Sequence, residues 1–536
     1  MKAGRGTSGI VHAMVVVAAS SATALGLGFV KNVLAAFYFG TSGPMDAYLL
    51  ALLLPDVAMQ LARTGAFNFI PLFAAERERS EGEAWRAAGE MLSYWLAVLG
   101  GALSVGWLLA PAVLPLLAPG YDSGRRALTL GLTRILFLMA ASVGAGRILG
   151  VMLHAERRFV AAGASEVAFQ AGSTAFLVAT HRMGVESLAL AQVFGGFLQF
   201  LVVAVALLPR RHRLRAGLAF ASAPVRRLIR LSLPVYLGDT GDKVNLMVTR
   251  AFASFLPTGA VSGLQYAYTP VEGIHRMLAG PLTTAFFPFL SSRFAKADQH
   301  GARLSLGRAL VTMVLVFSPM AVASWLLADP LVVVLFERGS FDVESTRVTA
   351  SALRLFAPSV LALALNELVG SSFHARQDTL TPMRAGLLRV GTNALLCASL
   401  APSLGHQGIA LATTVSLYLK LAYLASSLRR VFPPHEARRH LLDLGRVGLS
   451  VAAMAAVVYP VAAFAAVPAV VEEHAALALG VLGLLCLSTY AAALWLFAPR
   501  LLLVHLALLR HSIVRPLGRA AAVARASAGR LLRDPA

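Results

Sequence analysis

The residues with the most unusual chemistry in this sequence are charged side chains that stand inside long apolar segments. Lys31, Asp46, Asp56 and Arg63 lie within the run KNVLAAFYFGTSGPMDAYLLALLLPDVAMQLARTGAFNFIPLF. A charge at the centre of a bilayer costs about 2.5–3.5 kcal/mol on insertion scales, so such residues normally face a cavity or a partner. These four residues therefore predict a polar site inside a membrane protein.

A second set of polar side chains occupies a corresponding stretch later in the chain. Its members are Asp239, Asp242, Lys243, Asn245, Arg250, Glu272, His275 and Arg276, and Asn32 adds to the first set. Ammonium and guanidinium groups match the charge and geometry of phosphate, so a cavity lined by both sets would suit an anionic ligand. For single residues the alternatives stay open. Lys31 could extend to the membrane interface, Asp46 could cap a helix, and Lys243 could simply pair with the aspartate four residues before it.

Composition places the chain among membrane proteins. Of its 536 residues, 57% are hydrophobic and 14% are charged, and the mean hydropathy is +0.71, which excludes an ordinary soluble protein. The net charge is +21, but the arginines stand in short clusters between apolar runs, so we expect topology signals and no nucleic-acid partner. Cys397 and Cys486 each lie in an apolar run without a neighbouring cysteine, which argues against a disulfide or a metal site.

Hydropathy predicts fourteen membrane-spanning helices of an all-α polytopic protein. They cover roughly residues 11–38, 46–73, 88–117, 130–154, 160–180, 186–208, 229–254, 261–290, 306–328, 348–372, 384–403, 408–428, 447–467 and 474–498. The apolar stretch near the N-terminus is interpreted as the first span and not as a cleaved signal.

Basic residues gather in every second loop between these segments. The loop near residues 209–230 is the densest in arginine, whereas the loops GTSGPM and GHQG contain no Lys or Arg. The positive-inside rule then places the basic loops and both termini in the cytoplasm, which requires an even number of spans. The tail after Pro499 mixes apolar residues with arginines, which indicates a basic amphipathic segment on the membrane surface or a disordered tail.

An internal echo predicts how the helices are organised. GAFNFIPLFAAERER, from Gly65, resembles TTAFFPFLSSRFAKA, from Thr283, and six predicted helices separate the copies. An even separation preserves orientation, so we expect two six-helix lobes in a parallel repeat, unless the likeness is chance between apolar segments. The predicted divisions are lobes over 1–215 and 216–440, a helix pair over 441–498 and a tail over 499–536.

Enzyme signatures are absent from the sequence. It contains no GxxxxGK[ST] phosphate loop, no HExxH and no GxSxG elbow, and GAGRILG at Gly144 lies in a predicted membrane helix, where glycines permit close packing. We therefore expect no catalytic residue, cofactor or metal.

Eight short motifs occur along the chain in a recognisable order. They are GTSGPMDAYLLALLLPD, GAFNFIPLF, APGYD at Ala118, LTRILF at Leu132, RRF at Arg157, FASFLPTGAVSGLQYAY at Phe252, FERGSFD at Phe336 and SSFHARQDTLTP at Ser371. Over roughly residues 11–430 the chain resembles the MurJ/MviN family, the lipid II flippases of the MOP (multidrug/oligosaccharidyl-lipid/polysaccharide) exporter superfamily. The resemblance implies two six-helix lobes and a terminal helix pair with a groove for a lipid tail. It also implies a central cavity that alternates between the membrane faces and binds the diphosphate-sugar head group of undecaprenyl-linked lipid II.

Individual residues carry over from the family only in part. Asp46 matches the family's acidic residue, Lys31 stands where an arginine is usual, and Asp56 replaces an asparagine. Three positions that are arginine in well-studied members are not basic here; they are Leu25, Met59 and Thr269.

Together these observations predict a flippase that moves lipid II from the cytoplasmic to the periplasmic face. We expect Lys31, Lys243 and Arg276 to contact the diphosphate, and Asp46 and Asp56 to orient the cations or respond to closure. The full predicted cavity set is Lys31, Asn32, Asp46, Asp56, Arg63, Asp239, Lys243, Arg250, Glu272 and Arg276. The lost arginines keep three alternatives open: a flippase for another polyprenyl-linked glycan, such as an exopolysaccharide or O-antigen unit, a drug antiporter, and a non-transporting scaffold. Expected partners are the undecaprenyl-diphosphate-linked saccharide, membrane lipids and the cell-wall or polysaccharide synthesis machinery.

Overall fold

The computed structural model describes residues 3–210, 217, 222–296, 298–429, 437–465 and 468–503, and within this part the chain is helical without strands. The helices, in chain order, are α1 (Ala3–Phe39), α2 (Gly43–Ala51), α3 (Leu53–Arg79), α4 (Glu81–Leu117), α5 (Ser123–Ala155), α6 (Phe159–Thr180), η1 (His181–Met183), α7 (Glu186–Leu207), η2 (Leu208–Arg210), α8 (Ala223–Ala253), α9 (Ala260–Ile274), η3 (His275–Ala279), α10 (Gly280–Ala295), α11 (Gln299–Leu326), α12 (Ala328–Phe336), α13 (Val343–Phe356), α14 (Ser359–Ala375), α15 (Leu380–Arg429), α16 (Ala437–Ala465) and α17 (Pro468–Phe497).

The prediction of an all-α polytopic protein is confirmed. Nine helices in the described part are long and apolar enough to cross a membrane, or ten if α13 and α14, which are bent by 42°, form one span. Each of the fourteen predicted segments falls on one or more of the observed helices. Fourteen spans remain a prediction, as do the domain divisions, and most of the predicted tail lies outside the described residues.

Local sequence explains where the helices break. Gly40 has a φ of +54°, a conformation that favours glycine, and it separates α1 from α2. Ser42 caps α2 by accepting a hydrogen bond from the Met45 N–H, and a proline lies in the first turn. The predicted segments 384–403 and 408–428 form one long helix, α15, which kinks at Gly405 (φ 59°, ψ −134°).

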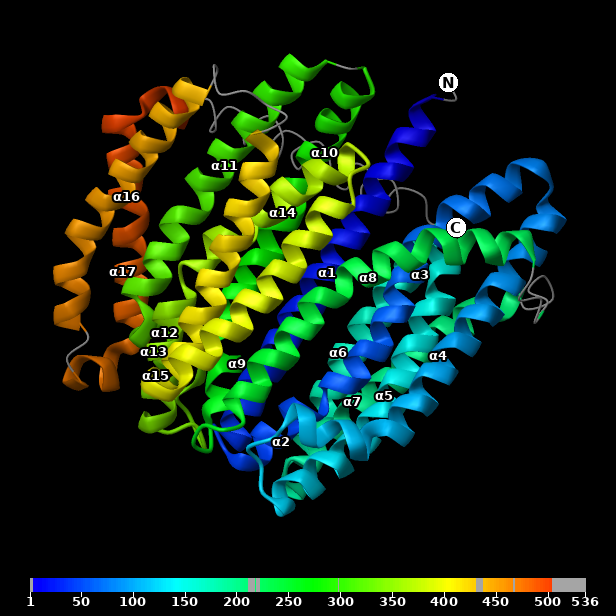
Figure 1. Ribbon diagram of the computed structural model, residues 1–536, viewed down its shortest axis with the longest axis horizontal. Coiled ribbons are helices and arrows are strands. Elements are labelled where there is room, and N and C mark those ends of the chain that lie inside the picture. The colour runs from blue at the N-terminus through cyan, green and yellow to red at the C-terminus, as the bar shows by residue number, and fades with distance from the viewer. Residues whose placement is uncertain are drawn as a thin grey trace, which may run out of the picture.

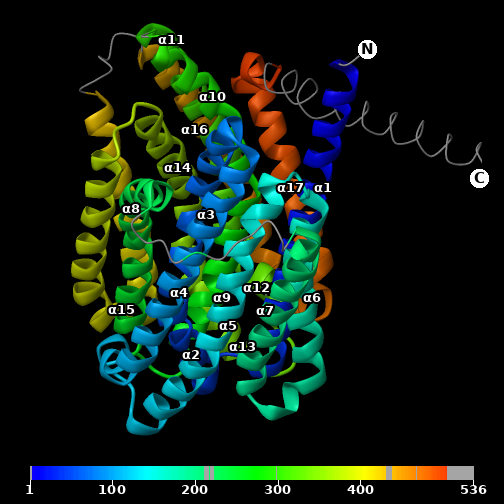
Figure 2. The same ribbon diagram turned by 90° about the vertical axis from the view of Figure 1, so that its right-hand side faces the viewer.

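The helices form two groups that lie side by side (Figures 1 and 2). We call α1–α7 the N-terminal lobe, α8–α15 the C-terminal lobe, and α16 with α17 the terminal pair. The terminal pair packs against α11 and α12, and the Tyr490 hydroxyl donates to the Leu315 carbonyl at 2.7 Å. Large apolar side chains such as Leu108, Leu484 and Trp495 are exposed, as expected on a surface that faces lipid.

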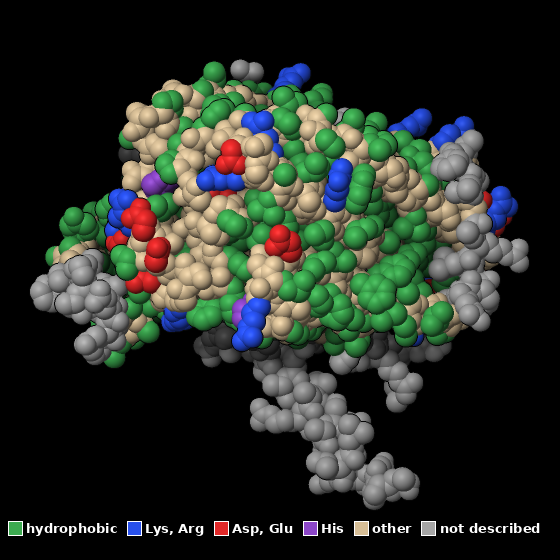
Figure 3. Space-filling model, turned by 90° about the horizontal axis from the view of Figure 1, so that it is seen from below, with side chains coloured by type: hydrophobic (Ala, Val, Ile, Leu, Met, Phe, Trp, Pro, Cys, Tyr) green, Lys and Arg blue, Asp and Glu red, His purple; other side chains and the backbone are tan. Residues whose placement is uncertain are grey.

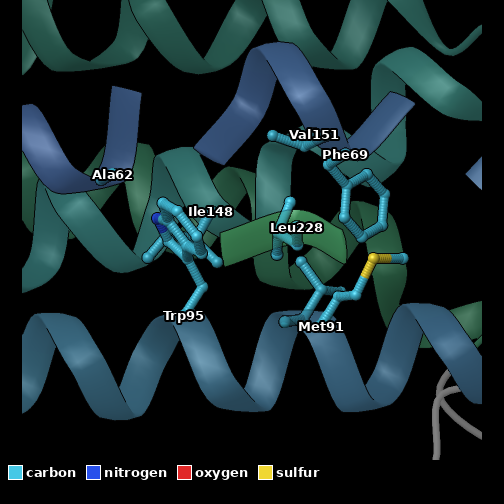
Figure 4. A pocket seen from close by; sticks show the side chains of 8 residues that line it. Ala62, Phe69, Met91, Trp95, Ile148, Val151 and Leu228 are labelled. Atoms are coloured by element: carbon cyan, nitrogen blue, oxygen red, sulfur yellow. The ribbon is translucent and has the colours of Figure 1, made fainter. Parts of the chain in front are cut away.

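Helix α8 connects the two lobes. Its first part packs against α3 and α4 of the N-terminal lobe, where Val225 and Leu228 join an apolar cluster with Met91 and Trp95, and it also packs along α15. Figure 4 shows Leu228 among side chains of α3, α4 and α5 around a small apolar gap of about 10 Å³. A gap of this size is a packing defect in a filled interior and not a ligand site.

Candidate functional site

A polar cavity of about 530 Å³ lies between the two lobes. Its wall is formed by α3 of the N-terminal lobe and by α8, α9, η3, α13, α14 and α15 of the C-terminal lobe. The lining residues are Gln60, Arg63, Asp242, Lys243, Asn245, Leu246, Thr249, Arg250, Ala253, Val261, Leu264, Gln265, Tyr268, Glu272, His275, Arg276, Phe356, Leu363, Arg389 and Thr413.

The cavity wall carries an excess of positive charge. Five lining side chains are Arg or Lys and two are Asp or Glu, an excess of three; Asp56 and Glu367, which pair with lining residues, reduce it to one. Two of the cations lack a carboxylate partner within the described residues. Arg63 is exposed to the cavity without a hydrogen-bond partner there, and Arg250 donates to the Leu49 carbonyl oxygen and, at 2.8 Å, to Gln265 Oε1. Such groups are ready to bind an anion.

Ion pairs hold the remaining cations of the wall. Lys243 Nζ lies 3.1 Å from Asp56 Oδ2, and this pair joins α8 of one lobe to α3 of the other. Arg389 Nη1 lies 2.6 Å from Asp242 Oδ1; the arginine side chain is 9% exposed and the aspartate side chain 67% exposed. Arg389 is therefore anchored in the C-terminal lobe and presents its partner to the cavity.

A π-helical turn brings two more ionisable groups to the cavity. The predicted segment 261–290 is divided into α9, the π turn η3 and α10, and both His275 and Arg276 of η3 line the cavity. Arg276 Nη2 lies 2.6 Å from Glu272 Oε1, and His275 Nε2 lies 3.1 Å from Glu367 Oε2. Single π turns inside α-helices occur often at functional sites.

A buried carboxylate joins the lobes beside the lining residue Val261. Asp46 of α2 is 2% exposed. Its Oδ2 accepts from the Gly259 N–H at 2.7 Å, and its Oδ1 accepts from the N–H and the hydroxyl of Ser262 at 2.8 Å and 2.6 Å. Asp46 thus caps the N-terminus of α9 from the opposite lobe, where a negative charge is favoured. We call this contact, together with the contacts of Thr41 with Ser345 and of Phe37 with Ser340, the outer gate, a name that follows the proposed membrane orientation.

Glycines allow the two lobes to meet closely at the outer gate. The Ser340 N–H donates to the Phe37 carbonyl at 2.8 Å, and the hydroxyls of Thr41 and Ser345 are 2.7 Å apart. A Cβ atom on Gly40 would lie 2.1 Å from the Ser340 carbonyl oxygen, so no other residue fits there. Figure 3 shows this end of the molecule as a surface of apolar side chains (green) and of backbone and other uncharged side chains (tan), with scattered charges.

Lys31 is held inside the N-terminal lobe and does not line the cavity. Its Nζ donates to Gln170 Oε1 and Gln192 Oε1 at 3.0 Å each and to Ser173 Oγ at 3.3 Å, and it lies 5.0 Å from the centre of the Phe169 ring. All of these partners are neutral groups on α6 and α7. In this conformation Lys31 does not reach the cavity, and its role as a diphosphate ligand stays a prediction.

The predicted residues thus fall into three places. Arg63, Lys243, Arg250, Glu272 and Arg276 line the cavity, Asp56 joins it through Lys243, and Asp46 lies at the outer gate. Lys31 and the exposed Asn32 lie elsewhere, and the side chain of Asp239 is outside the described part of the structure.

Sequence reasoning missed Arg389, and it did not anticipate Gln265 and Tyr268 as lining residues. Arg389 could have been found by the rule that singled out Lys31, because it is a charge inside a predicted span. Leu25, Met59 and Thr269, the three positions where the resemblance implies arginines, do not line the cavity.

Comparison with known proteins gives a consistent result. The family model described as lipid II flippase MurJ matches residues 35–499. A probable lipid II flippase MurJ from Rhizobium tropici is 29% identical over 424 residues, which cover 75% of this chain and 78% of that protein. The lipid II flippase MurJ of Burkholderia cenocepacia is 28% identical over 415 residues, covering 75% and 80%.

Solved structures show a similar fold. The structure of lipid II flippase MurJ in an inward closed conformation matches with a TM-score of 0.75 at 20% identity, over 91% of this chain and 99% of that one. An inward-facing multidrug resistance MATE family transporter of the MOP superfamily matches with a TM-score of 0.61 at 14% identity, over 76% and 94%.

Proposed function

The chain belongs to the lipid II flippase MurJ family, and from this premise we propose that it carries lipid II from the cytoplasmic to the periplasmic face of the inner membrane. The observation that carries the proposal is the cavity between the lobes, which has an excess of cations and lies beside the cross-lobe contact of Asp46. Charged side chains inside membrane-spanning segments are costly and normally have a partner. Because Arg63 and Arg250 lack a carboxylate partner within the described residues, we infer that they bind an anionic ligand.

The size and chemistry of the cavity suit a diphosphate head group. A volume of about 530 Å³ lies within the usual range of ligand sites, roughly 300–1,000 Å³, and is too small for a whole polyprenyl lipid. The phosphates would bind the cations, and the amide of Gln265 and the ring of Tyr268 would contact the saccharide. The lipid tail would stay outside the cavity, against the apolar outer surface of the helices.

Alternating access accounts for the outer gate. The basic loops lie at the end of the lobes opposite Asp46, so the positive-inside rule assigns the gate to the periplasmic face and both termini to the cytoplasm. In this conformation the ligand would enter from the cytoplasmic side. Opening of the outer gate would then expose the same cations to the periplasm.

A flippase for another polyprenyl-linked glycan is the second candidate. The observation in its favour is that Leu25, Met59 and Thr269 replace three cations of the family without a substitute at those positions. Such a change would alter recognition of the saccharide while the diphosphate remained a shared element. Assembly with the cell-wall or polysaccharide synthesis machinery is proposed for both cases.

The test is depletion of the protein in its own host, followed by mass spectrometry of the polyprenyl-linked intermediates. We expect lipid II to accumulate, and to be cleared by wild-type protein but not by the double variant Lys243→Gln, Arg276→Gln. Arg347→Gln is the matched control, because Arg347 is exposed and pairs with Glu344 away from the cavity. Accumulation of another lipid-linked glycan with lipid II unchanged would favour the second candidate, and no accumulation of either would refute both.

A further inference from the structure

We propose that Asp56 occupies the place of a ligand phosphate on Lys243, and that ligand binding displaces it and so releases a tie between the lobes. The inference rests on the proposed function, because it needs a phosphate-bearing ligand in the cavity. In this proposal Asp56 does not bind the ligand. It competes with the ligand phosphate for Lys243, and it leaves Lys243 when the ligand occupies the cavity.

The pair stands alone among the contacts that join the lobes. Asp56 and Lys243 form the sole ion pair between α1–α7 and α8–α15 that the described residues contain. We call the contact of α2 and α3 with α8 the seam. Apart from the Asp56–Lys243 pair, the seam hydrogen bonds described next have neutral acceptors. Arg250 donates to the Leu49 carbonyl oxygen on one side of the pair, and Asn68 Nδ2 donates to Ser232 Oγ at 3.0 Å on the other. An anionic ligand can replace the carboxylate of Asp56 directly, whereas the contacts of Arg250 and Asn68 contain no carboxylate. Asp46, the other carboxylate that joins the lobes, is 2% exposed and does not line the cavity.

Exposure makes this exchange feasible. The side chains of Lys243 and Asp56 are 27% and 31% exposed, and Lys243 lines the cavity. Partly hydrated ion pairs contribute little net free energy, so the pair is easily exchanged. A diphosphate brings more charge and more acceptor oxygens than one carboxylate and makes stronger charge-assisted hydrogen bonds. Lys243 should therefore prefer the ligand when the ligand is present.

The displaced carboxylate changes the interaction between the lobes. With a phosphate on Lys243, Asp56 faces a like charge and is repelled, so an attraction across the seam becomes a repulsion. Arg147 of α5, in the same lobe as Asp56, lies within electrostatic range of it and offers the displaced carboxylate another cation. Ligand binding thereby loosens the middle of the seam, between the outer gate and the contact of Asn68 with Ser232.

A binding cycle on the purified full-length protein tests the exchange, with farnesyl diphosphate as the probe. Asp56→Asn should bind the probe about three- to tenfold more tightly than wild type, because the competitor is gone. Lys243→Gln should bind it more weakly, and the double variant should bind it like Lys243→Gln. Asp56→Glu keeps the ion pair and should stay close to wild type, which controls for folding.

Three outcomes separate the possible failures. Weaker binding by Asp56→Asn would mean that Asp56 positions Lys243 for the ligand, which overturns the exchange. If Asp56→Asn raised the affinity for the probe equally in the Lys243→Gln background, Asp56 would act only through its negative charge in the cavity and not by competing for Lys243. This result would also overturn the exchange. Absence of probe binding by wild type would refute the phosphate chemistry of the proposed function itself.

The rate of disulfide formation across the seam measures whether ligand binding separates the lobes there. With Cys397 and Cys486 replaced by alanine, cysteines at the positions of Asn68 and Ser232 should form a disulfide that farnesyl diphosphate slows. The same ligand should have no effect on the disulfide in the Asp56→Asn background, because no repulsion arises there. A ligand effect that persists without the Asp56 charge would refute the release.

Discussion

Replacing Asp46 by asparagine should shift the protein toward a conformation that is open at the outer gate. The two carboxylate oxygens of Asp46 accept three hydrogen bonds, from the Gly259 N–H and from the N–H and hydroxyl of Ser262. Asparagine has the same shape but only one acceptor oxygen. If that oxygen stays on Ser262, the amide NH₂ faces the Gly259 N–H, and two donors meet without an acceptor.

The cost can be worked from these contacts. A buried donor without a partner costs about 1–3 kcal/mol. Loss of a negative charge at the N-terminus of α9 adds about 0.3–1 kcal/mol. Together these give about 1.3–4 kcal/mol, or roughly a 10- to 850-fold change in an equilibrium constant. Because Asp46 and α9 belong to different lobes, the cost falls on the closed conformation alone, so the equilibrium moves toward the open one.

Labelling of a cavity cysteine measures this shift. Leu363 lines the cavity and makes no side-chain hydrogen bond, so Leu363→Cys in a background without Cys397 and Cys486 gives one reporter. A membrane-impermeant maleimide added from the outer face should label it at least tenfold faster with Asp46→Asn than with Asp46, as the shift in population requires.

The matched control is Asp378→Asn. Asp378 accepts from the N–H and the hydroxyl of Thr381 at 3.0 Å and 2.7 Å, the same chemistry within a single lobe. This variant loses a helix cap without touching the outer gate, so the labelling rate should stay at the wild-type value. If Asp46→Asn folded normally but labelled no faster than wild type, or if both variants labelled equally fast, the cross-lobe cap would not control access.

Three further predictions concern other parts of the fold. Gly40→Ala should open the outer gate more than Asp46→Asn in the same labelling assay, because its Cβ would lie 2.1 Å from the Ser340 carbonyl oxygen. Lys31→Gln should lower the free energy of unfolding by about 1–3 kcal/mol, seen as a lower Tm. Its affinity for farnesyl diphosphate should stay within about twofold of wild type, because Lys31 does not line the cavity in this conformation. Met91→Ala, in the fully buried cluster of α3, α4, α5 and α8, should lower stability by about 2–5 kcal/mol without changing the labelling rate, as judged by thermal unfolding and the maleimide assay together.

The helices could be predicted because lipid forces each apolar segment to satisfy its own backbone hydrogen bonds. Hydropathy located every segment, but it could not find the break at Leu52 or the π turn at His275. Neither break changes the apolar character of its segment. The π turn brings His275 and Arg276 to the cavity, and the break at Leu52 ends α2, whose Asp46 contacts the other lobe. Hydropathy contains neither of these relations.

The site was only partly predictable for a different reason. Charge inside a span finds residues that need a polar environment, and two residues that it singled out, Lys243 and Arg276, line the cavity. Their role in binding stays a prediction. It cannot say which polar environment each residue finds. Lys31 donates hydrogen bonds to Gln170 and Gln192, which a search for charged residues inside apolar segments does not detect because their side chains are uncharged. The contact of Asp56 with Lys243 joins residues 187 positions apart, so only the packing of the lobes could reveal it.

The composition of the outer gate explains how a tight closure can also be reversible. Its cross-lobe contacts at Asp46, Thr41 and Ser340 are hydrogen bonds between small polar side chains or backbone groups. When such contacts separate, water supplies replacement partners, so each costs only about 0.5–1.5 kcal/mol net, or up to about 3 kcal/mol for a charged acceptor. Separation of large apolar side chains would offer no such replacement. The hydrogen bonds formed by Asp, Ser, Thr and Gly at the gate therefore fit closely when it is shut, and their separation carries a cost that ligand binding in the cavity can offset.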